Sequence, residues 1–390
     1  MKILLMTDAL PFPLDHGLKL RVFNFCRELY KIHEIDLLCY DTSPLPEELA
    51  PLFHRVFQFE KPKANDTSNN IVHKVLNPFS YEGLVRSSED AKLSFPNLIN
   101  EYEYDLIWVY RGMMTTLPEK LNTPVVADII DDYMLDYWRR LKAATKLVDK
   151  AKYYKWYKTV CSYEREVFSR ATRLVFASSP DAEACARQLK HTPCDVVSNG
   201  VDVNYYNALE GIQKDPNLIV FEGKMDFAPN EDGMLFFCEE VFPKILKIRP
   251  QTKLRIVGKN PTPAISALAS PNIEVTGFVD DVRTYVQEAS VFVCPLRFGS
   301  GVKNKILQAW SLGMPVVGTT KTTGGINAID GQNMLIEDDA SQFAIKVCDL
   351  LDDTNMQAKL GANARRDIVA DFSWQTKSKE LNALFEEAVR

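Results

Sequence analysis

The sequence predicts an α/β protein with two doubly wound parallel sheets, on three observations. First, 390 residues exceed what one hydrophobic core usually serves, so two domains of about 150–200 residues are expected. Second, short apolar runs alternate with helix-like stretches in both halves, which is typical of a parallel sheet covered on both faces. Third, several of these runs end in glycine, so their ends open on one edge of the sheet.

The first half contains six predicted strands, each a short apolar run. They cover residues 2–6, 35–40, 55–59, 106–109, 124–129 and 173–177. The run from Val196 to Asp202 adds a strand and a turn signal where this half ends. Helices are expected near 18–30 and over 139–158.

The second half repeats the alternation after a polar linker at 210–217. Strands are predicted at 218–222, 253–257, 272–276, 291–294 and 315–318, and helices near 232–248, 280–288, 302–312, 340–351 and 356–369. A last helix, over 375–390, can return to the first domain. We therefore expect one domain over 1–205 plus 373–390 and a second over 206–372.

The composition excludes several classes of protein. A net charge of −6, from 46 basic and 52 acidic residues, argues against bulk nucleic-acid binding. No apolar run approaches bilayer length, and the chain start becomes polar too early for a signal peptide. The eight cysteines are scattered, without a Cys-x-x-Cys pair, and indicate free thiols in a reducing cytoplasm. The five dispersed histidines indicate no metal site.

The stretch from Arg297 to Thr319 has the pattern of a phosphate-binding loop. Gly299 and Gly301 permit a tight turn with close backbone approach, and the helix predicted over 302–312 would point its free N–H groups into that loop. Lys305 and Gln308 lie three residues apart on one face of the helix, so a cation and an amide share the same space. The alternative is an ordinary surface helix with solvated lysines.

Two further places in the first half carry candidate ligands, each with an alternative. The loop after the first strand leads to Gly17 and Arg21, which can meet an anion or form a plain helix entry. It lacks a Gly-x-Gly-x-x-Gly fingerprint, so a nicotinamide cofactor is not supported. The strand over 124–129 runs into Asp128, Asp131 and Asp132, which can bind sugar hydroxyls, or one of them can cap the next helix.

The helix expected over 139–158 has eight basic residues and one acid, interleaved with aromatic residues. Such a segment, here 137–158, can contact an anionic membrane surface at the inner face or hold a lipid-phosphate acceptor. The alternative, which the pattern favours because the apolar face is not segregated, is a solvated helix whose aromatic side chains pack on the sheet.

Together these pieces resemble the retaining glycosyltransferases of the GT-B fold, in family four, which use nucleoside-diphosphate sugars. The resemblance covers almost the whole chain. It depends on the Pro-x-x-x-x-Gly17 loop, on Asn199-Gly200-Val201-Asp202, on Val257-Gly258, on Val275-Thr276-Gly277-Phe278-Val279-Asp280-Asp281, and on the glycine-loop helix ending Gly313-Met314-Pro315-Val316-Val317. Phe221-x-Gly223-x-Met225-x-x-x-Pro229-Asn230 and Pro295-Leu296-Arg297 look like a bacterial subgroup of exopolysaccharide assembly.

The resemblance implies two Rossmann-like domains, with the donor on the second domain and the acceptor on the first. Donor-binding positions would be Gly17, Gly277, Phe278, Gly299, Ser300, Gly301, Val302, Lys303 and Gln308. Catalytic positions would be Lys224, Lys305 and Asp131, and the acceptor or sugar would contact Asp15, His16, Arg21, Asp128 and Arg111. Two glutamates usual in the family fall here on Ser300 and Gln308, and a usual histidine falls on Ile130.

The function expected is transfer of a sugar to a polysaccharide, oligosaccharide or glycolipid, with retention, by front-face displacement and without a metal or other cofactor. Such a reaction requires positive charge and N–H dipoles at the leaving phosphate rather than a protein nucleophile. Two rival hypotheses are a nucleotide-sugar epimerase of the same fold and a non-catalytic sugar-nucleotide binding protein.

Overall fold

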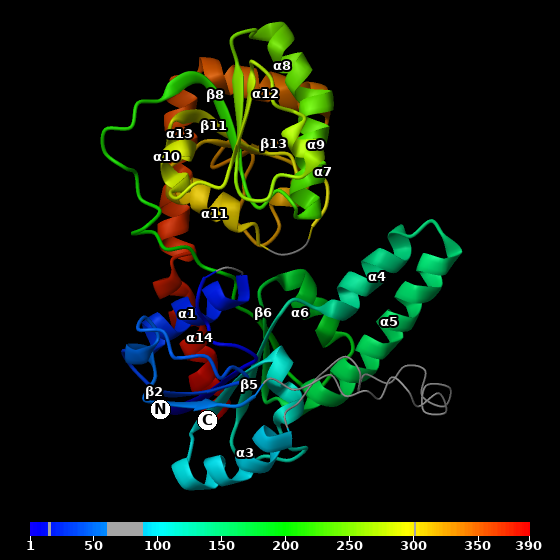
Figure 1. Ribbon diagram of the computed structural model, residues 1–390, viewed down its shortest axis with the longest axis vertical. Coiled ribbons are helices and arrows are strands. Elements are labelled where there is room, and N and C mark those ends of the chain that lie inside the picture. Colours follow the sequence, from blue (N-terminus) through cyan, green and yellow to red (C-terminus); the bar gives the residue numbers. More distant parts are fainter. Residues whose placement is uncertain (15–16, 61–88, 300–301) are drawn as a thin grey trace. The chain divides into compact units, whose positions relative to one another are not determined.

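The chain folds into two compact units, each with its own parallel sheet (Figure 1). Unit 1 comprises Met1–Ser198 with Lys377–Arg390, and unit 2 comprises Asn199–Thr376. The computed structural model describes residues 1–14, 17–60, 89–299 and 302–390. The α/β fold class expected from the sequence is confirmed in both units.

Unit 1 has a 7-stranded sheet in the order β3-β2-β1-β4-β5-β6-β7, and all of its strand pairs are parallel. Its strands are β1 (Lys2–Thr7), β2 (Glu34–Cys39), β3 (Arg55–Gln58), β4 (Leu106–Tyr110), β5 (Val125–Ile130), β6 (Arg173–Phe176) and β7 (Cys194–Val196). The central strands are buried on both faces, as their unbroken apolar runs predict.

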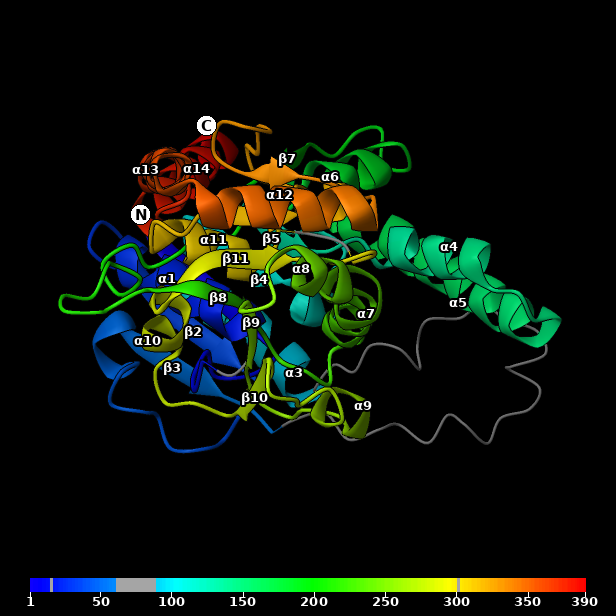
Figure 2. The same cartoon turned by 90° about the horizontal axis from the view of Figure 1, so that it is seen from above.

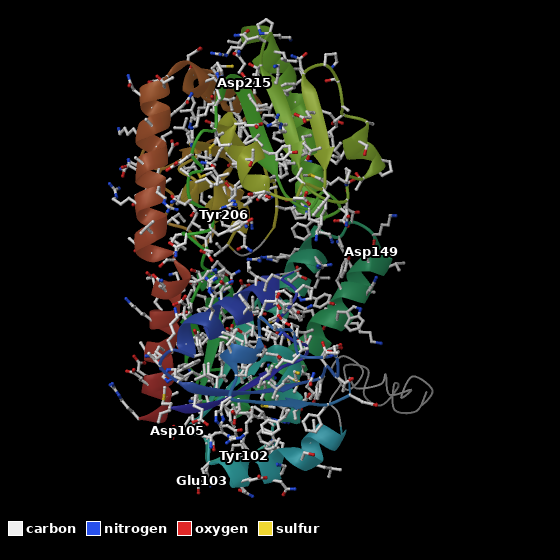
Figure 3. The ribbon with its side chains drawn as sticks, turned by 60° about the vertical axis from the view of Figure 1, so that its left-hand side comes forward. Tyr102, Glu103, Asp105, Asp149, Tyr206 and Asp215 are labelled. Carbon is white, nitrogen blue, oxygen red and sulfur yellow. The ribbon has the colours of Figure 1, made fainter. Side chains whose placement is uncertain are left out.

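The helices of unit 1 are α1 (Gly17–Leu29), α3 (Glu89–Tyr102), α4 (Tyr133–Ala143), α5 (Leu147–Val167) and α6 (Ser179–Ala186). Where α3 leads into β4, Asp105 accepts a hydrogen bond from the backbone N–H of Lys2 at 2.7 Å (Figure 3). This bond joins the starts of the neighbouring strands β1 and β4.

The prediction of a single helix over 139–158 was wrong. The chain turns at 144–146, so α4 and α5 form a helical hairpin that extends away from the sheet of unit 1 (Figures 1 and 2). The aromatic residues expected to pack on the sheet pack between the two helices instead: Tyr137 stacks on Trp156 with ring centroids 6.0 Å apart. In the described part of the chain no helix is both long and apolar enough to cross a bilayer.

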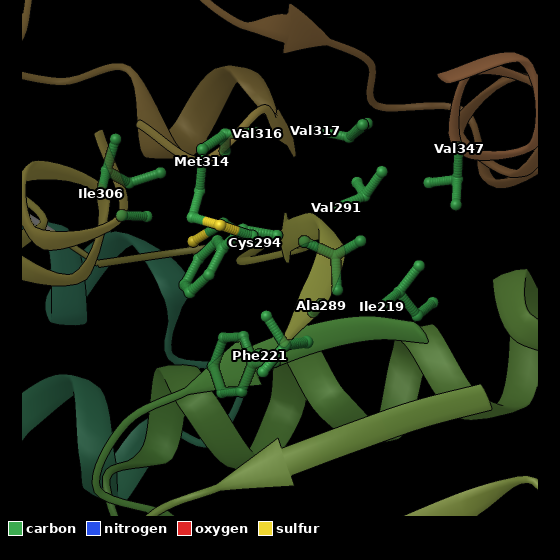
Figure 4. Close-up of a cluster of buried hydrophobic side chains, with 14 of the residues drawn as sticks. Ile219, Phe221, Ala289, Val291, Cys294, Ile306, Met314, Val316, Val317 and Val347 are labelled. Carbon is green, nitrogen blue, oxygen red and sulfur yellow. The ribbon is translucent and has the colours of Figure 1, made fainter. Parts of the chain in front are cut away.

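Unit 2 has a 6-stranded parallel sheet in the order β10-β9-β8-β11-β12-β13. Its strands are β8 (Asp215–Glu222), β9 (Lys253–Val257), β10 (Ile273–Gly277), β11 (Ala289–Cys294), β12 (Val316–Gly318) and β13 (Leu335–Ile336). The core joins strand and helix side chains, with Phe221, Val291 and Ile306 completely buried (Figure 4).

The helices of unit 2 are α7 (Ala228–Phe236), α8 (Phe242–Ile248), α9 (Pro263–Ser266), α10 (Val282–Gln287), α11 (Asn304–Ser311), α12 (Ala340–Asp352) and α13 (Thr354–Asp371). Aspartates cap three of them: Asp281 accepts from a backbone N–H at the start of α10, Asp339 at the start of α12 and Asp353 at the start of α13. The helix expected over 302–312 begins later, at Asn304.

The last helix, α14 (Trp374–Val389), begins in unit 2 and has most of its length in unit 1. In unit 2, a Cβ on Gly200 would lie 2.8 Å from the Trp374 ring, so glycine in the Asn199–Asp202 motif permits this contact. In unit 1, Phe385 packs on Trp108 with ring centroids 5.5 Å apart. The expected return of the terminal helix to the first domain is confirmed.

Candidate active site

Ligands of an open parallel sheet bind at its carboxyl edge, where the strand order reverses and neighbouring loops diverge. In unit 2 this point lies between β8 and β11, because β9 and β10 follow on one side of β8 while β12 and β13 lie beyond β11. The loop after β8 contains Gly223, and the loop after β11 contains Gly299. These two loops and the start of α11 form the candidate site.

Glycines let the backbones at this edge pack directly on one another. The N–H of Gly223 donates to the Val257 carbonyl at 2.9 Å, and the N–H of Gly258 donates to the Gly277 carbonyl at 3.1 Å. A Cβ on Gly258 would lie 1.8 Å from the Gly223 oxygen. No side chain fits there, so glycine at position 258 is what lets these two backbone segments pack against each other.

Lys305 reaches from α11 to the end of β8. Its ammonium donates to the Glu222 carbonyl at 2.7 Å and to the Asn230 amide oxygen at 2.8 Å, and it lies 4.1 Å from the centre of the Phe221 ring. A Cβ on Gly223 would lie 2.5 Å from this nitrogen, so glycine at that position makes room for the cation.

The charge of Lys305 is positioned but not neutralised by a direct ion pair. Burial lowers the pKa of Lys305, while nearby Cys294 and the Glu222 carboxyl oppose that shift. Burial also raises the pKa of Glu222. Within the described residues no carboxylate oxygen lies in salt-bridge distance of the ammonium. An ammonium has three N–H donors, and the two bonds above use two of them.

The structure explains the motif that runs from Phe221 to Asn230. Phe221, Gly223 and Asn230 surround the Lys305 ammonium, and Pro229 lies 3.6 Å from where a Cβ of Gly299 would be. The motif was recognised from the sequence, but its relation to Lys305 was missed, because residues about eighty positions apart carry no visible signal of contact. Its purpose here is to hold the cation and support the glycine loop.

The glycine loop itself is only partly described. Gly299 has a φ of 120°, a left-handed conformation that favours glycine, and the Lys303 ammonium lies 3.6 Å from its Cβ position. Val302 lies against Gly325. Ser300 and Gly301, and likewise Asp15 and His16 of unit 1, lie outside the described residues. Gln308 is half-buried on α11.

Two other expected donor residues are placed at the same edge. Gly277 ends β10 with a φ of 70° and has open space at its Cβ position, and the Phe278 side chain after it is 72% exposed. An exposed aromatic ring beside bare backbone offers a flat surface on which a nucleobase can stack. Lys224, by contrast, extends into solvent and pairs with Asp226 at 3.3 Å.

In unit 1, two expected acceptor residues bind each other. The Arg21 guanidinium donates to both carboxylate oxygens of Asp128, at 2.9 and 3.2 Å, and both side chains are almost fully buried. Burial raises the pKa of Asp128, and Arg21 opposes that shift. This ion pair joins α1 to β5. Because each side chain is buried against the other, neither offers its charge to a ligand.

Arg111, at the end of β4, joins the chain after β5 to α5. It donates to the Asp131 carbonyl at 2.8 Å, pairs with Glu164 and lies 3.7 Å from the centre of the Tyr133 ring. Burial raises the pKa of Glu164 to about 7, against the attraction of Arg111. Glu164 was missed in the sequence, where it resembles any helical glutamate.

The acids after β5 have different environments. Asp132 caps α4 by accepting from the Leu135 N–H at 2.9 Å, so the capping alternative holds for this residue. Asp131 is exposed and stays a candidate for acceptor chemistry. Ile130 has a φ of 68°, which costs a β-branched residue about 1–2 kcal/mol.

The expected donor residue Gly17 lies at the start of α1. A Cβ at this position would face open space.

Known proteins resemble part or all of this chain. Residues 216–353 match the family model described as Glycosyl transferases group 1. An uncharacterized 44.6 kDa protein in the cps region of Klebsiella pneumoniae is 24% identical over 184 residues, 43% of this chain and 45% of that protein. CapM of Staphylococcus aureus, a capsular polysaccharide biosynthesis glycosyltransferase, is 29% identical over 30% of this chain and 31% of CapM. These matches span less than half of either relative.

Solved structures match over the whole chain. Sucrose-phosphate synthase from Thermosynechococcus elongatus has a TM-score of 0.69 at 16% identity, over 99% of this chain and 98% of that one. Anabaena Alr3699/HepE, in complex with UDP and glucose, has a TM-score of 0.65 at 14% identity, over 99% and 100%. At this identity the likeness shows the fold, which is GT-B. The match of residues 216–353 to the group 1 family model confirms the expected resemblance to group 1 glycosyltransferases.

Proposed function

We propose that this protein transfers a sugar from a nucleoside-diphosphate sugar, held at the carboxyl edge of unit 2, to a saccharide or lipid-linked acceptor. The observation that carries the proposal is the Lys305 ammonium, held by neutral oxygens at the reversal point of the sheet. It lies within the segment that matches the group 1 family model. A positioned cation at this place can stabilise charge on a leaving diphosphate.

The proposed reaction proceeds with retention by front-face displacement. The bond between the sugar C1 and the diphosphate oxygen breaks, and a bond forms between C1 and the acceptor oxygen on the same face. The acceptor proton passes to the leaving phosphate oxygen. Lys305, with Lys303 and the N–H groups at the start of α11, would stabilise the leaving group, so no metal ion is needed.

The donor and acceptor follow from the relatives and from the site. The complex of Anabaena HepE with UDP and glucose supports a nucleotide-sugar donor. We propose that the base of the donor stacks near Gly277, on the exposed Phe278 ring. Capsular polysaccharide biosynthesis by CapM supports a polysaccharide or lipid-linked acceptor, with Asp131 of unit 1 as a candidate acceptor contact. Because the proposed catalysis needs no metal ion, we expect sugar transfer from the donor to continue in the presence of a chelator.

The test is a panel of UDP and GDP sugars, incubated with and without saccharide acceptors. We expect nucleoside diphosphate release that depends on acceptor, and a product with the anomeric configuration of the donor by NMR. Lys305→Gln should lower turnover by about 10²-fold or more, whereas Lys359→Gln, an exposed lysine on α13, should not change it.

Two outcomes would support the rival functions instead. Donor binding by calorimetry without turnover for any acceptor would indicate a non-catalytic binding protein. A converted nucleotide sugar formed from donor alone would indicate an epimerase. Because Lys305 is half-buried and holds two hydrogen bonds, the unfolding transition of Lys305→Gln is measured alongside, so that a loss of activity is not mistaken for a loss of fold.

A further inference from the structure

The α4–α5 hairpin exposes two aliphatic side chains side by side at its turn. Leu147 and Val148, the first two residues of α5, are 83% and 80% exposed. These values exceed those of every other large apolar side chain in the described residues. These two adjacent aliphatic side chains form a small exposed apolar patch at the tip of the hairpin, which is unfavourable in water.

The aromatic residues of the hairpin do not contribute to this patch. Tyr137 stacks on Trp156, and Trp138 packs on Tyr157 with ring centroids 5.3 Å apart, so the rings hold the two helices together. The hairpin is therefore a rigid support. With a rise of about 1.5 Å per residue, the eleven residues of α4 carry the turn roughly 16 Å from its start.

The exposed surface of the hairpin is strongly basic. Residues 133–158 contain eight exposed basic residues and two acids: Arg139, Arg140, Lys142, Lys146, Lys150, Lys152, Lys155 and Lys158, with Asp136 and Asp149. Asp136 pairs with Arg140 at 2.8 Å. Asp149, visible on α5 in Figure 3, lies in the first turn of its helix, where a carboxylate is favoured by the helix dipole.

We propose that this hairpin docks the protein on an anionic lipid surface, with Leu147 and Val148 inserted among the acyl chains and the surrounding lysines on the headgroup phosphates. Apolar area at the tip and positive charge behind it are the two features that bind a peripheral element to such a surface. The net charge of the whole chain is −6, so the basic charge is concentrated on the element that carries the apolar tip.

The experiment measures cosedimentation of the full chain with vesicles of phosphatidylcholine and phosphatidylglycerol, and with vesicles of phosphatidylcholine alone. We expect binding to the anionic vesicles only, weakened by added salt. Leu147→Ser with Val148→Ser should lower the partition coefficient by at least about tenfold, because the two aliphatic side chains that insert into the bilayer are lost. Lys146→Gln with Lys150→Gln should lower it by roughly tenfold and reduce its salt dependence.

A matched control is Ile32→Ser, which removes an aliphatic side chain of unit 1 that is 61% exposed but outside the hairpin. It should bind vesicles like the wild type. In Leu147→Trp, the emission should shift further to the blue on adding anionic vesicles than that of the wild type, whose five tryptophans set the background, and the difference reports insertion of the tip.

Three outcomes would overturn the proposal: no vesicle binding at low salt, equal loss in the Ile32→Ser control, or a concentration-dependent dimer that Leu147→Ser with Val148→Ser abolishes. The last would show that the tip contacts a second copy of the chain. Vesicle binding is measured without donor or acceptor, so its failure would leave the proposed transfer chemistry untouched.

Discussion

Both units hold basic side chains against their sheet, but the partners differ. In unit 1, Arg21 pairs directly with Asp128, and Arg111 pairs with Glu164. In unit 2, the hydrogen-bond acceptors of Lys305 are a backbone carbonyl and an amide oxygen. A carboxylate neutralises a cation and commits it to the fold, whereas neutral acceptors fix its position and leave its charge for an anionic ligand.

The largest effect is expected from breaking the Arg21–Asp128 pair. Asp128→Leu leaves a buried guanidinium without its carboxylate, and we expect the free energy of unfolding to fall by about 3–5 kcal/mol in urea titrations. The double variant Arg21→Met with Asp128→Leu should regain most of that loss. If the double variant is as unstable as the single one, the pair is not what holds α1 to β5.

The second-largest effect is expected in the pH dependence of the unfolding free energy, to which the Arg111–Glu164 pair contributes. The Glu164 carboxyl has its pKa raised from 4.5 to about 7 by burial, so between these values the folded state holds more protons than the unfolded state. Stability should therefore fall as pH rises through this window, by on the order of 3 kcal/mol. Glu164→Gln cannot titrate and should show a flatter profile of unfolding free energy against pH. Glu166→Gln, on the exposed side of α5, is the control and should keep the wild-type slope.

A third variant gives Lys305 of unit 2 a carboxylate partner, like the partners of Arg21 and Arg111 in unit 1. Asn230→Asp places a carboxylate oxygen at about the position of an amide oxygen that is 2.8 Å from the Lys305 ammonium. The charge that a diphosphate would meet is then neutralised, and donor affinity by calorimetry should fall by roughly ten- to a hundredfold. Asn230→Ala removes the hydrogen bond to Lys305 without adding charge. An equal loss in both variants would show that position, rather than charge, is what Asn230 supplies.

The smallest effect is expected at Lys224, whose side chain is 53% exposed and pairs with Asp226. A solvated ion pair contributes about 0–1 kcal/mol, so Lys224→Met should change the unfolding free energy by no more than that. Donor affinity should fall only a few-fold. A loss comparable to that of Lys305→Gln would instead make Lys224 a diphosphate contact, as the family resemblance implies.

The comparison also shows where sequence reasoning succeeds. Most strands of both sheets were predicted close to their positions, because a parallel strand covered on both faces requires an unbroken apolar run. The two-residue strand β13 was not predicted, and β7 ends where the run predicted at 196–202 begins. The split of the helix expected over 139–158 was missed, because Ala144 and Thr145 carry no glycine or proline signal at the turn. The sequence did not show whether Asp131 or Asp132 caps α4, because this depends on the backbone path after Ile130.

By itself, the sequence determined the two-sheet architecture, the glycine turns at one edge and the family resemblance, because each is written in local pattern or short motif. Only the tertiary structure decided which cations are neutralised. Lys305 meets Glu222 and Asn230, and Arg21 meets Asp128, across about eighty to one hundred residues of chain. Whether a buried charge serves the fold or a ligand depends on the atoms around it, and those come from distant segments that folding alone brings together.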